Sequence, residues 1–302
     1  MSPPAWLWIV FVLVASGGQV ARNAMQRDLM GPLGAAGATS VRFLFGLPFA
    51  LLFLPGVLLA TGQAVPSLGV AAFAWTAAGA LAQIFATGLM LAAMQRRSFV
   101  VATAYLKTEP VIVALFGLAF LGERLGVTAS LAVAVATAGV MTMSLPRSWP
   151  RGVGDDASLL PALYGIGSAA LFALSAVGYR AGILALGMSS FVPAATVTLA
   201  LALTIQTVLI VIVLFATNRA LLGALLRHWR PSLLAGFTGA AASQFWFLAF
   251  AIESAARVRT LALVEIVFAQ IVSRRMFGQA ATAREIVGMA AMAAGVIGLV
   301  RG

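Results

Sequence analysis

Long apolar runs, separated by short polar breaks, fill the sequence from end to end. A helix that crosses a membrane needs about 20 largely apolar residues, and runs of that length recur throughout the chain. They predict ten transmembrane helices, at residues 4–21, 33–60, 68–94, 99–121, 125–145, 159–185, 189–217, 231–252, 258–277 and 283–300. The pattern therefore predicts an all-α integral membrane protein with no separate soluble domain.

The breaks between the runs carry charged, amide and aromatic side chains, as expected where helices leave a membrane. The longest break, residues 146–158, lies at mid-chain and contains two arginines and two aspartates. It predicts a linker between two five-helix halves, residues 1–145 and 159–302. The first apolar run lacks the basic region that opens a signal peptide, so we expect it to remain as the first helix.

The two halves also resemble each other in sequence. A single shift of 156 residues superposes identical residues at several positions: Glu109 on Glu265, Gly122 on Gly278, and Ala138, Gly139 and Val140 on Ala294, Gly295 and Val296. Because each half holds an odd number of predicted helices, the second half must enter the membrane inverted relative to the first. Inverted repeats of this kind are typical of transporters.

Composition indicates that lipid is the solvent. Apolar residues make up 62% of the 302 and charged residues 9%, so a soluble domain of this composition would expose a continuous apolar surface. The formal net charge of +11 does not point to a nucleic-acid partner, because the basic residues stand singly or in pairs at helix ends. The absence of cysteine excludes disulfides, thiolate catalysis and Cys-ligated metal.

Ionisable residues inside apolar runs are costly and therefore are candidates for function. Four lie deep within predicted helices: Arg42, Lys107, Glu109 and Glu265. Lys107 and Glu109 are two residues apart, about 200° around a helix axis, so each needs its own partner. Pro110 predicts a kink beside them. Each charged residue either lines a solute cavity or forms a structural ion pair, and Arg42 can instead extend toward an interface.

Amide and aromatic side chains are mixed in the third and eighth predicted helices, and a tyrosine lies near the charged residues of the fourth. Gln83 lies in the third, Tyr105 shares a face of the fourth with Glu109, and Gln244 and Trp246 lie in the eighth. Buried amides must be hydrogen-bonded, so the glutamines either join helices or bind a solute. The aromatic rings favour either ordinary packing or a cavity for an apolar group.

Two further groups of basic residues have simpler interpretations. Arg257 and Arg259 open the ninth predicted helix, where they either anchor the interface or contact an anionic solute, and anchoring is preferred. The single histidine, His228, has no neighbouring metal-ligating residues in the sequence, so no metal site is expected.

Short motifs of the first half resemble a known family. They are Ala93–Met94, Leu-Lys-Thr-Glu-Pro at 106–110, Phe-Leu-Gly-Glu-Arg-Leu-Gly at 120–126 and Ala-Gly-Val at 138–140. The pattern resembles the EamA-type branch of the ten-helix drug/metabolite transporter superfamily, and within it the amino acid exporters, including the aromatic amino acid type. The second half keeps Glu265, Gly278 and Gly295, but has Ile266 where the pattern has proline and Gln279 where it has glutamate.

The resemblance implies a secondary transporter in the bacterial inner membrane that exports small metabolites, most closely amino acids, by alternating access through a cavity between two inverted repeats. Its solute contacts would come from the eight candidates named above. A carrier of organic anions such as sugar phosphates is the alternative, because four basic side chains could serve an anion: Arg42, Lys107, Arg257 and Arg259. An intramembrane enzyme is disfavoured, because G-x-S-x-G and H-E-x-x-H motifs are absent.

No catalytic residue, cofactor or metal is expected. The expected contacts are a small solute and membrane lipid, and the sequence leaves open whether the chain forms a homo-oligomer.

Two arguments disagree about orientation. The resemblance implies that both termini are cytoplasmic, whereas arginines and lysines normally concentrate in cytoplasmic loops. With cytoplasmic termini, the predicted loops would place five arginines inside and twelve outside, among them Arg22 and Arg27. We expect cytoplasmic termini, because the resemblance spans the whole chain.

Overall fold

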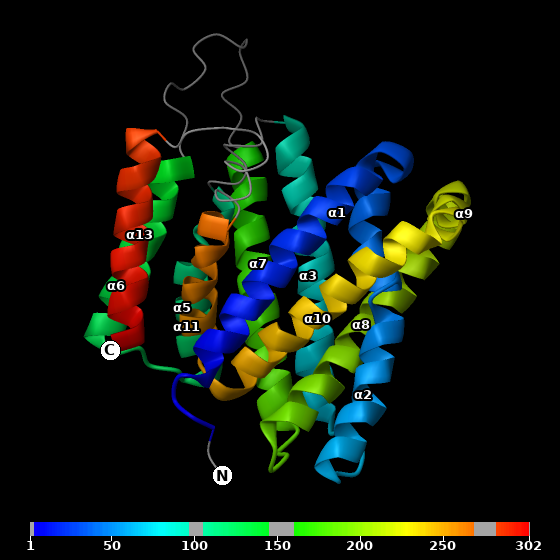
Figure 1. Cartoon of the computed structure of the whole chain (residues 1–302), viewed down its shortest axis with the longest axis horizontal. Helices are drawn as coiled ribbons and strands as arrows, with labels where there is room; N and C mark the ends of the chain where they lie inside the picture. Colours follow the sequence, from blue (N-terminus) through cyan, green and yellow to red (C-terminus); the bar gives the residue numbers. More distant parts are fainter. Residues whose placement is uncertain (1–2, 97–104, 145–159, 269–281, 302) are drawn as a thin grey trace. The chain divides into compact units, whose positions relative to one another are not determined.

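The computed structural model describes residues 3–96, 105–144, 160–268 and 282–301 (Figure 1), and every regular element in these ranges is helical. The elements are α1 (Leu7–Leu44), α2 (Leu47–Thr61), α3 (Val70–Arg96), α5 (Glu109–Leu121), α6 (Val127–Ser144), α7 (Leu160–Ala185), α8 (Phe191–Thr217), α9 (Arg219–Arg227), α10 (Trp229–Ile252), α11 (Ala255–Leu261), the 3-10 helix η1 (Ala262–Val264) and α13 (Ala283–Arg301). The all-helical class predicted from the sequence is confirmed for this part of the chain.

Several of these helices are long and apolar enough to cross a membrane. Among the described residues six such spans occur: Leu7–Thr61, Val70–Ala93, Ala162–Ala185, Phe191–Thr217, Trp229–Ile252 and Ala283–Arg301. The shorter apolar helices α5 and α6 supplement them. The chain is thus a multi-pass membrane protein, while the number of ten spans stays a prediction.

Helix α1 departs most from the predicted boundaries. It continues through residues 22–33, where charged side chains predicted a break, so that prediction is wrong. The helical path is interrupted at Gly34 instead, at φ 67° and ψ 174°, a conformation that glycine adopts without a side-chain clash. Across this bend Gln26 Nε2 donates to the carbonyl oxygen of Ala38 at 2.7 Å. Backbone conformation, rather than side-chain charge, therefore sets the turn.

Two other local predictions are corrected by the structure. Pro110 does not kink a helix but lies in the first turn of α5, where the missing N–H has no helical acceptor to lose. The segment predicted as a loop after α8 contains α9, whose first turn is capped by Asn218: its Oδ1 accepts from the backbone N–H of Leu221 at 3.0 Å. With nine residues, α9 is too short to span a membrane.

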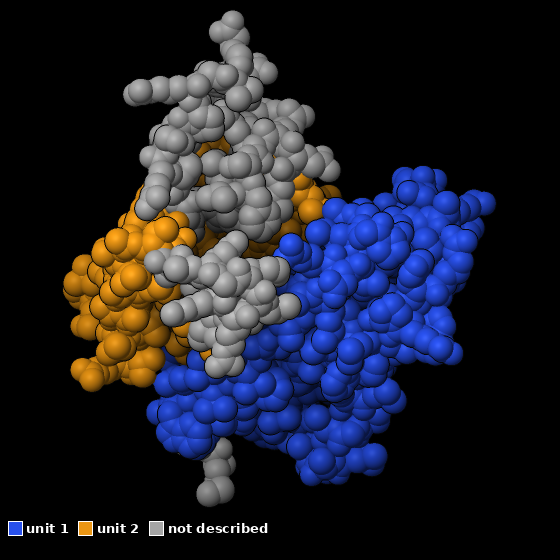
Figure 2. Space-filling view, turned by 45° about the horizontal axis from the view of Figure 1, so that its top comes forward, with its two compact units in different colours: residues 1–81, 178–253 blue, residues 82–177, 254–302 orange. Residues whose placement is uncertain are grey.

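The chain packs as two compact units, coloured separately in Figure 2. Unit 1 comprises Met1–Leu81 and Gly178–Glu253, and unit 2 comprises Ala82–Val177 and Ser254–Gly302. The boundaries fall within α3 and α7, so each of these helices contributes to both units. Each unit draws on both halves of the sequence. The predicted linker 146–158 lies outside the described residues, and the division into two sequence halves stays a prediction.

Within unit 1, α1 packs along α10, and α8 contacts both α2 and α10. Small residues permit the close approach of α1 and α10: a Cβ built on Gly18 would lie 3.1 Å from Cβ of Ala242. Gly236 of α10 likewise faces the backbone of Phe45, between α1 and α2. Close helix contacts through small residues are the usual packing mode in membranes.

Within unit 2, α6 and α13 lie side by side (Figure 1). Gly139 of α6 faces the backbone of Met292 and Gly288, and Gly295 of α13 faces the backbone of Ala136 and Ala132. A Cβ built on either glycine would lie 2.5 Å from a backbone nitrogen. The two helices therefore touch through their main chains.

Candidate functional site

The candidate site is built around the start of α5, in unit 2. Lys107 and Thr108 form a turn, and the Thr108 hydroxyl donates to the carbonyl oxygen of Tyr105 at 2.8 Å. Helix α5 then begins at Glu109, and an acidic residue in the first turn is favoured by the helix dipole. The sequence thus places a base and an acid two residues apart at an interruption of an apolar helical run.

Glu109 forms a two-point ion pair with Arg259 of α11. Arg259 Nε donates to Oε1 at 2.7 Å, and Nη2 donates to Oε2 at 2.8 Å. Two parallel charge-assisted bonds are among the strongest polar contacts that side chains make. The side chains are only 21% exposed for Arg259 and 13% for Glu109, so the pair is largely shielded from solvent.

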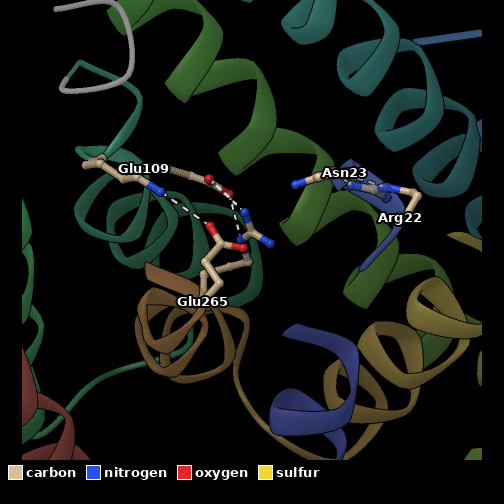
Figure 3. A network of polar contacts seen from close by, with 6 residues as sticks. Arg22, Asn23, Glu109 and Glu265 are labelled. Atoms are coloured by element: carbon tan, nitrogen blue, oxygen red, sulfur yellow. Dashed lines mark hydrogen bonds and ion pairs between the residues drawn. The ribbon is translucent and has the colours of Figure 1, made fainter. Parts of the chain in front are cut away.

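Lys107 pairs with the second glutamate. Its Nζ lies 3.3 Å from Oε1 of Glu265, the residue that follows η1. Arg259 also interacts electrostatically with Glu265. Figure 3 shows both glutamates in this set of contacts, which we call the charge network: Lys107, Glu265, Arg259 and Glu109. Its positive and negative groups alternate, and their formal charges cancel.

This arrangement confirms the prediction that Lys107 and Glu109 need separate partners. The prediction that Arg259 anchors an interface is wrong, because its guanidinium is engaged by Glu109. The partners were missed because they lie 150 or more residues apart in the sequence, and no local spacing links them.

Energetics explain why the charges occur together. A single charged side chain at the centre of a spanning helix costs about 2.5–3.5 kcal/mol on insertion scales. Pairing offsets that cost, whereas removal of one partner leaves the other charge uncompensated. Chemically, a charged group of a solute can therefore replace one internal partner, or a proton can neutralise a carboxylate. Either change alters the balance of positive and negative charge among the remaining groups.

Two further candidate solute-binding residues, Tyr105 and Gln83, lie in unit 2. Tyr105 packs against α7, where a Cβ built on Gly165 would lie 2.6 Å from Cβ of Tyr105. Gln83 is half-buried in α3, one turn before Thr87, whose hydroxyl donates to the Gln83 carbonyl oxygen at 2.8 Å. Solute contact by either residue stays a prediction.

Three predicted residues lie in unit 1. Gln244 Nε2 donates to Thr196 Oγ1 of α8 at 2.9 Å, and its buried Oε1 has no hydrogen-bond partner among the described residues. Gln244 therefore joins α10 to α8 and retains an acceptor for a further donor. Trp246 is buried and stacks on Phe250 with ring centroids 6.5 Å apart.

Arg42, the third, lies near the end of α1. Its guanidinium stacks over the ring of Phe43, 4.3 Å from the centroid, and interacts electrostatically with Tyr179. The Tyr179 hydroxyl accepts from Nε2 of Gln206, a fully buried residue of α8 that the sequence analysis missed.

Two arginines, Arg22 and Arg180, lie inside helices and form hydrogen bonds there. Arg22 is 8% exposed in α1, and its Nη2 donates to Asn23 Oδ1 at 2.8 Å (Figure 3). Arg180 lies in α7 and donates from Nη1 to the carbonyl oxygen of Phe250 at 2.6 Å. The break predicted at Arg22 is wrong because α1 extends past it, whereas Arg180 lies inside the helix predicted at 159–185.

Six apolar spans among the described residues, together with shielded pairs of ionisable side chains in other helical segments, define a multi-pass membrane protein. Residues 3–145 match the EamA-like transporter family, which confirms the predicted resemblance to the drug/metabolite transporter superfamily. The matched family is described as one of transporters.

Comparison with solved structures shows a shared fold. Among solved structures, 28 chains match this chain. One, titled only "Crystal structure of protein", has a TM-score of 0.70 and 14% sequence identity, and the alignment covers 98% of this chain and 95% of that one. No curated protein matches this chain.

Proposed function

We propose that the protein is a secondary transporter that exports small organic metabolites, specifically amino acids, across the bacterial inner membrane. The observation that carries the proposal is the charge network of unit 2, in which four mostly shielded charges cancel at interruptions of apolar helices. A purely structural unit has no need of such charges, because apolar side chains pack at lower cost. The resemblance to amino acid exporters supplies the solute class and the direction.

Transport by alternating access requires that the network be broken and re-formed. In this mechanism, a solute group or a proton competes for one member of the Glu109–Arg259 pair. When Glu109 is the group that is taken, the released Arg259 interacts with its other acidic neighbour, Glu265. Because this broken contact has a replacement of opposite charge, the change between two states is inexpensive.

Ten helices in two inverted five-helix repeats complete the proposal. The support for this repeat arrangement comes from the contacts between α6 and α13. These contacts are reciprocal when residues are paired by the 156-residue shift. Gly139 faces Met292 and Gly288, while the equivalent Gly295 faces the equivalent Ala136 and Ala132. Reciprocal contacts of this form are what a two-fold relation between equivalent helices produces.

Unit 1 offers groups that suit an amino acid. The Gln244 Oε1, buried and without a partner among the described residues, is an acceptor for an ammonium group. The Arg42 guanidinium is a donor for a carboxylate. Arg42 also favours the second candidate function, a carrier of organic anions. An organic anion needs only the guanidinium donor and not the amide acceptor.

Reconstitution into liposomes separates these candidates. Vesicles preloaded with unlabelled solute would be given labelled amino acids or labelled sugar phosphates, and label accumulation by counterflow would be measured. Accumulation of amino acids alone supports the proposal, and accumulation of sugar phosphates alone supports the organic-anion carrier. If no solute of either panel exchanges faster than in protein-free vesicles, the transport proposal is contradicted for these solutes.

A further inference from the structure

The turn between α9 and α10, in unit 1, exposes basic side chains that neither the charge network nor the proposed solute contacts use. We propose that Arg227, Trp229 and Arg230 form a binding site for the headgroup of an anionic phospholipid. The inference goes beyond the proposed function and does not rest on it, because it concerns the lipid around the protein rather than the transported solute.

The position of α9 places this turn at a membrane surface. Helix α8 ends at Thr217 and α10 begins at Trp229, both are long and apolar enough to cross a membrane, and α9 joins their ends (Figure 1). The nine residues of α9 extend about 14 Å, which is less than half of the hydrocarbon thickness. Residues 218–230 therefore stay on one side of the membrane, at the level of the phospholipid headgroups.

One face of α9 is packed on the protein and the other is open. Leu225 is fully buried in a cluster that includes Leu29 and Leu33 of α1. The next residue, Leu226, is 64% exposed, and Arg227 is exposed beside it. A short helix with one apolar face held down and basic side chains on the open face is suited to lie along a membrane surface.

Neither cation of the turn has an acidic partner in the parts of the chain that the structure describes. The Arg227 side chain forms no ion pair or hydrogen bond there, and Arg230 only places its guanidinium 5.4 Å from the ring centroid of Trp229. Residues 157–252 include no aspartate or glutamate, and Asp28 of α1, which is exposed, pairs with neither arginine. An anion from outside the protein can therefore bind both guanidinium groups.

The chemistry of these side chains matches a phospholipid headgroup. Trp229 is 47% exposed, and tryptophan rings favour the headgroup level, where one edge is apolar and the other can donate a hydrogen bond. Each guanidinium fork can donate to two oxygens of a phosphate. A lipid with net negative charge is preferred to a zwitterionic one, because basic side chains at a membrane surface are attracted by its charge.

The turn that carries the site is fixed by local hydrogen bonds. His228 Nδ1 donates to the carbonyl oxygen of Ala224 at 3.0 Å, and the His228 backbone N–H donates to the same oxygen at 3.1 Å. The backbone N–H of Ser232 then donates to the carbonyl oxygen of His228 at 3.3 Å. The backbone that presents Arg227, Trp229 and Arg230 is therefore ordered before a lipid binds, which lowers the entropic cost of binding.

The test uses the purified full-length protein in detergent micelles, so that binding is measured without transport. The thermal unfolding midpoint would be followed against increasing amounts of phosphatidylglycerol, of phosphatidylcholine and, without lipid, of inorganic phosphate. Wild type would be compared with the double variants Arg227→Gln with Arg230→Gln and Arg227→Lys with Arg230→Lys. The matched control is Arg124→Gln with Arg219→Gln, which also removes two exposed charges; Arg219 is held by the carbonyl oxygen of Phe215 at the other end of α9.

We expect phosphatidylglycerol to raise the midpoint of wild type and of the control at lower amounts than phosphatidylcholine does. Arg227→Gln with Arg230→Gln should weaken the apparent affinity for phosphatidylglycerol by about tenfold to thirtyfold, since each arginine near an anionic surface contributes a factor of about five. The lysine pair should fall between this variant and wild type, because the charges remain and the planar forks are lost.

A salt series on wild type tests the same claim without any variant, and so covers the case in which the glutamine pair fails to fold. Between about 0.1 M and about 1 M salt the screening length falls from about 10 Å to about 3 Å, so the preference for phosphatidylglycerol should shrink. A preference that does not change with salt overturns the site.

Three other results also overturn it. Equal stabilisation of wild type by the two lipids would show that the headgroup charge is not recognised. An equal loss of affinity in the control would show that only net charge matters, and not this turn. Stabilisation by inorganic phosphate as large as that by phosphatidylglycerol would show that the arginines bind a soluble anion rather than a lipid headgroup.

Discussion

Each glutamate of the charge network takes its cation from the other half of the sequence. Glu109 pairs with Arg259, and Glu265 pairs with Lys107. Because the two glutamates occupy equivalent positions under the 156-residue shift, the pairs link the halves crosswise. A side chain that must leave its partner during transport therefore affects both halves together.

Gln244 provides a residue-scale test of solute contact. Replacing it with leucine removes one hydrogen bond, to Thr196, and a buried acceptor that has no partner among the described residues. Unfolding should become easier by about 1 kcal/mol at most, whereas the solute's apparent affinity should fall by about tenfold or more. Thermal unfolding and solute competition measure the two effects.

Gln206→Leu is the control for Gln244→Leu, because Gln206 bonds to Tyr179 and to the carbonyl oxygen of Ala80 within the protein. It should reduce stability more than Gln244→Leu does. Unchanged solute affinity in Gln244→Leu, combined with a large loss of stability, would show that Gln244 only joins helices.

The sequence predicted which residues are unusual better than it predicted their partners. Lys107, Glu109 and Glu265 could be found because a charge within an apolar run is visible without a structure. Arg22 and Arg259 were misinterpreted, since basic residues near the ends of apolar runs normally mark the membrane interface. Only the three-dimensional path of α1 and α11 shows that both side chains are held within the helical units.

At the scale of helices, the close contact between α6 and α13 depends on glycine. Gly139→Ala and Gly295→Ala would each place a methyl group 2.5 Å from a backbone nitrogen, so the helices must move apart. We expect each to lower the free energy of unfolding by about 1–3 kcal/mol, as for overpacking in a core. Denaturation in detergent measures this.

The control for these variants is Gly126→Ala, since nothing lies within 4 Å of a Cβ built there. If Gly139→Ala is as stable as Gly126→Ala, the main-chain contact between α6 and α13 is not a determinant of stability.

The helices themselves followed from hydrophobic pattern, but their ends did not. Arg27 and Asp28 predicted a break, yet α1 continues past them because exposed charges are compatible with a helix. Gly34 ends the first helical path because it adopts a positive φ, which no hydropathy pattern reports. Likewise Pro110 fits the start of α5 as well as it would fit a kink, and only the backbone distinguishes these cases.

For the molecule as a whole, the class was predictable from composition, whereas the packing was not. The two compact units each combine segments from both ends of the chain, and sequence separation gives no indication of such pairing. The fold shared with a solved structure at 14% identity shows that two very different sequences can adopt the same helix arrangement.

Orientation is a whole-molecule prediction. Arg180 and Arg259 bond within the helical units, which removes two arginines from the five assigned to cytoplasmic loops. Arg22 is buried, which removes one from the twelve outside and leaves counts of three and eleven. We still expect cytoplasmic termini, on the family match of residues 3–145. Fluorescent-protein and alkaline phosphatase fusions at Gly302 measure this. Fluorescence without phosphatase activity is expected, and the reverse pattern would make the arginine count the better guide.

The central claim is that the charge network takes part in solute movement, and the rate of solute exchange in liposomes tests it most directly. Glu109→Gln keeps the shape of the side chain but removes the charge that Arg259 binds, so exchange should fall by about tenfold or more. Rates would be compared at equal amounts of folded protein, with Arg219→Gln as a control that should exchange like wild type. Exchange by Glu109→Gln at the wild-type rate would contradict the account, because Glu109 would then serve packing alone.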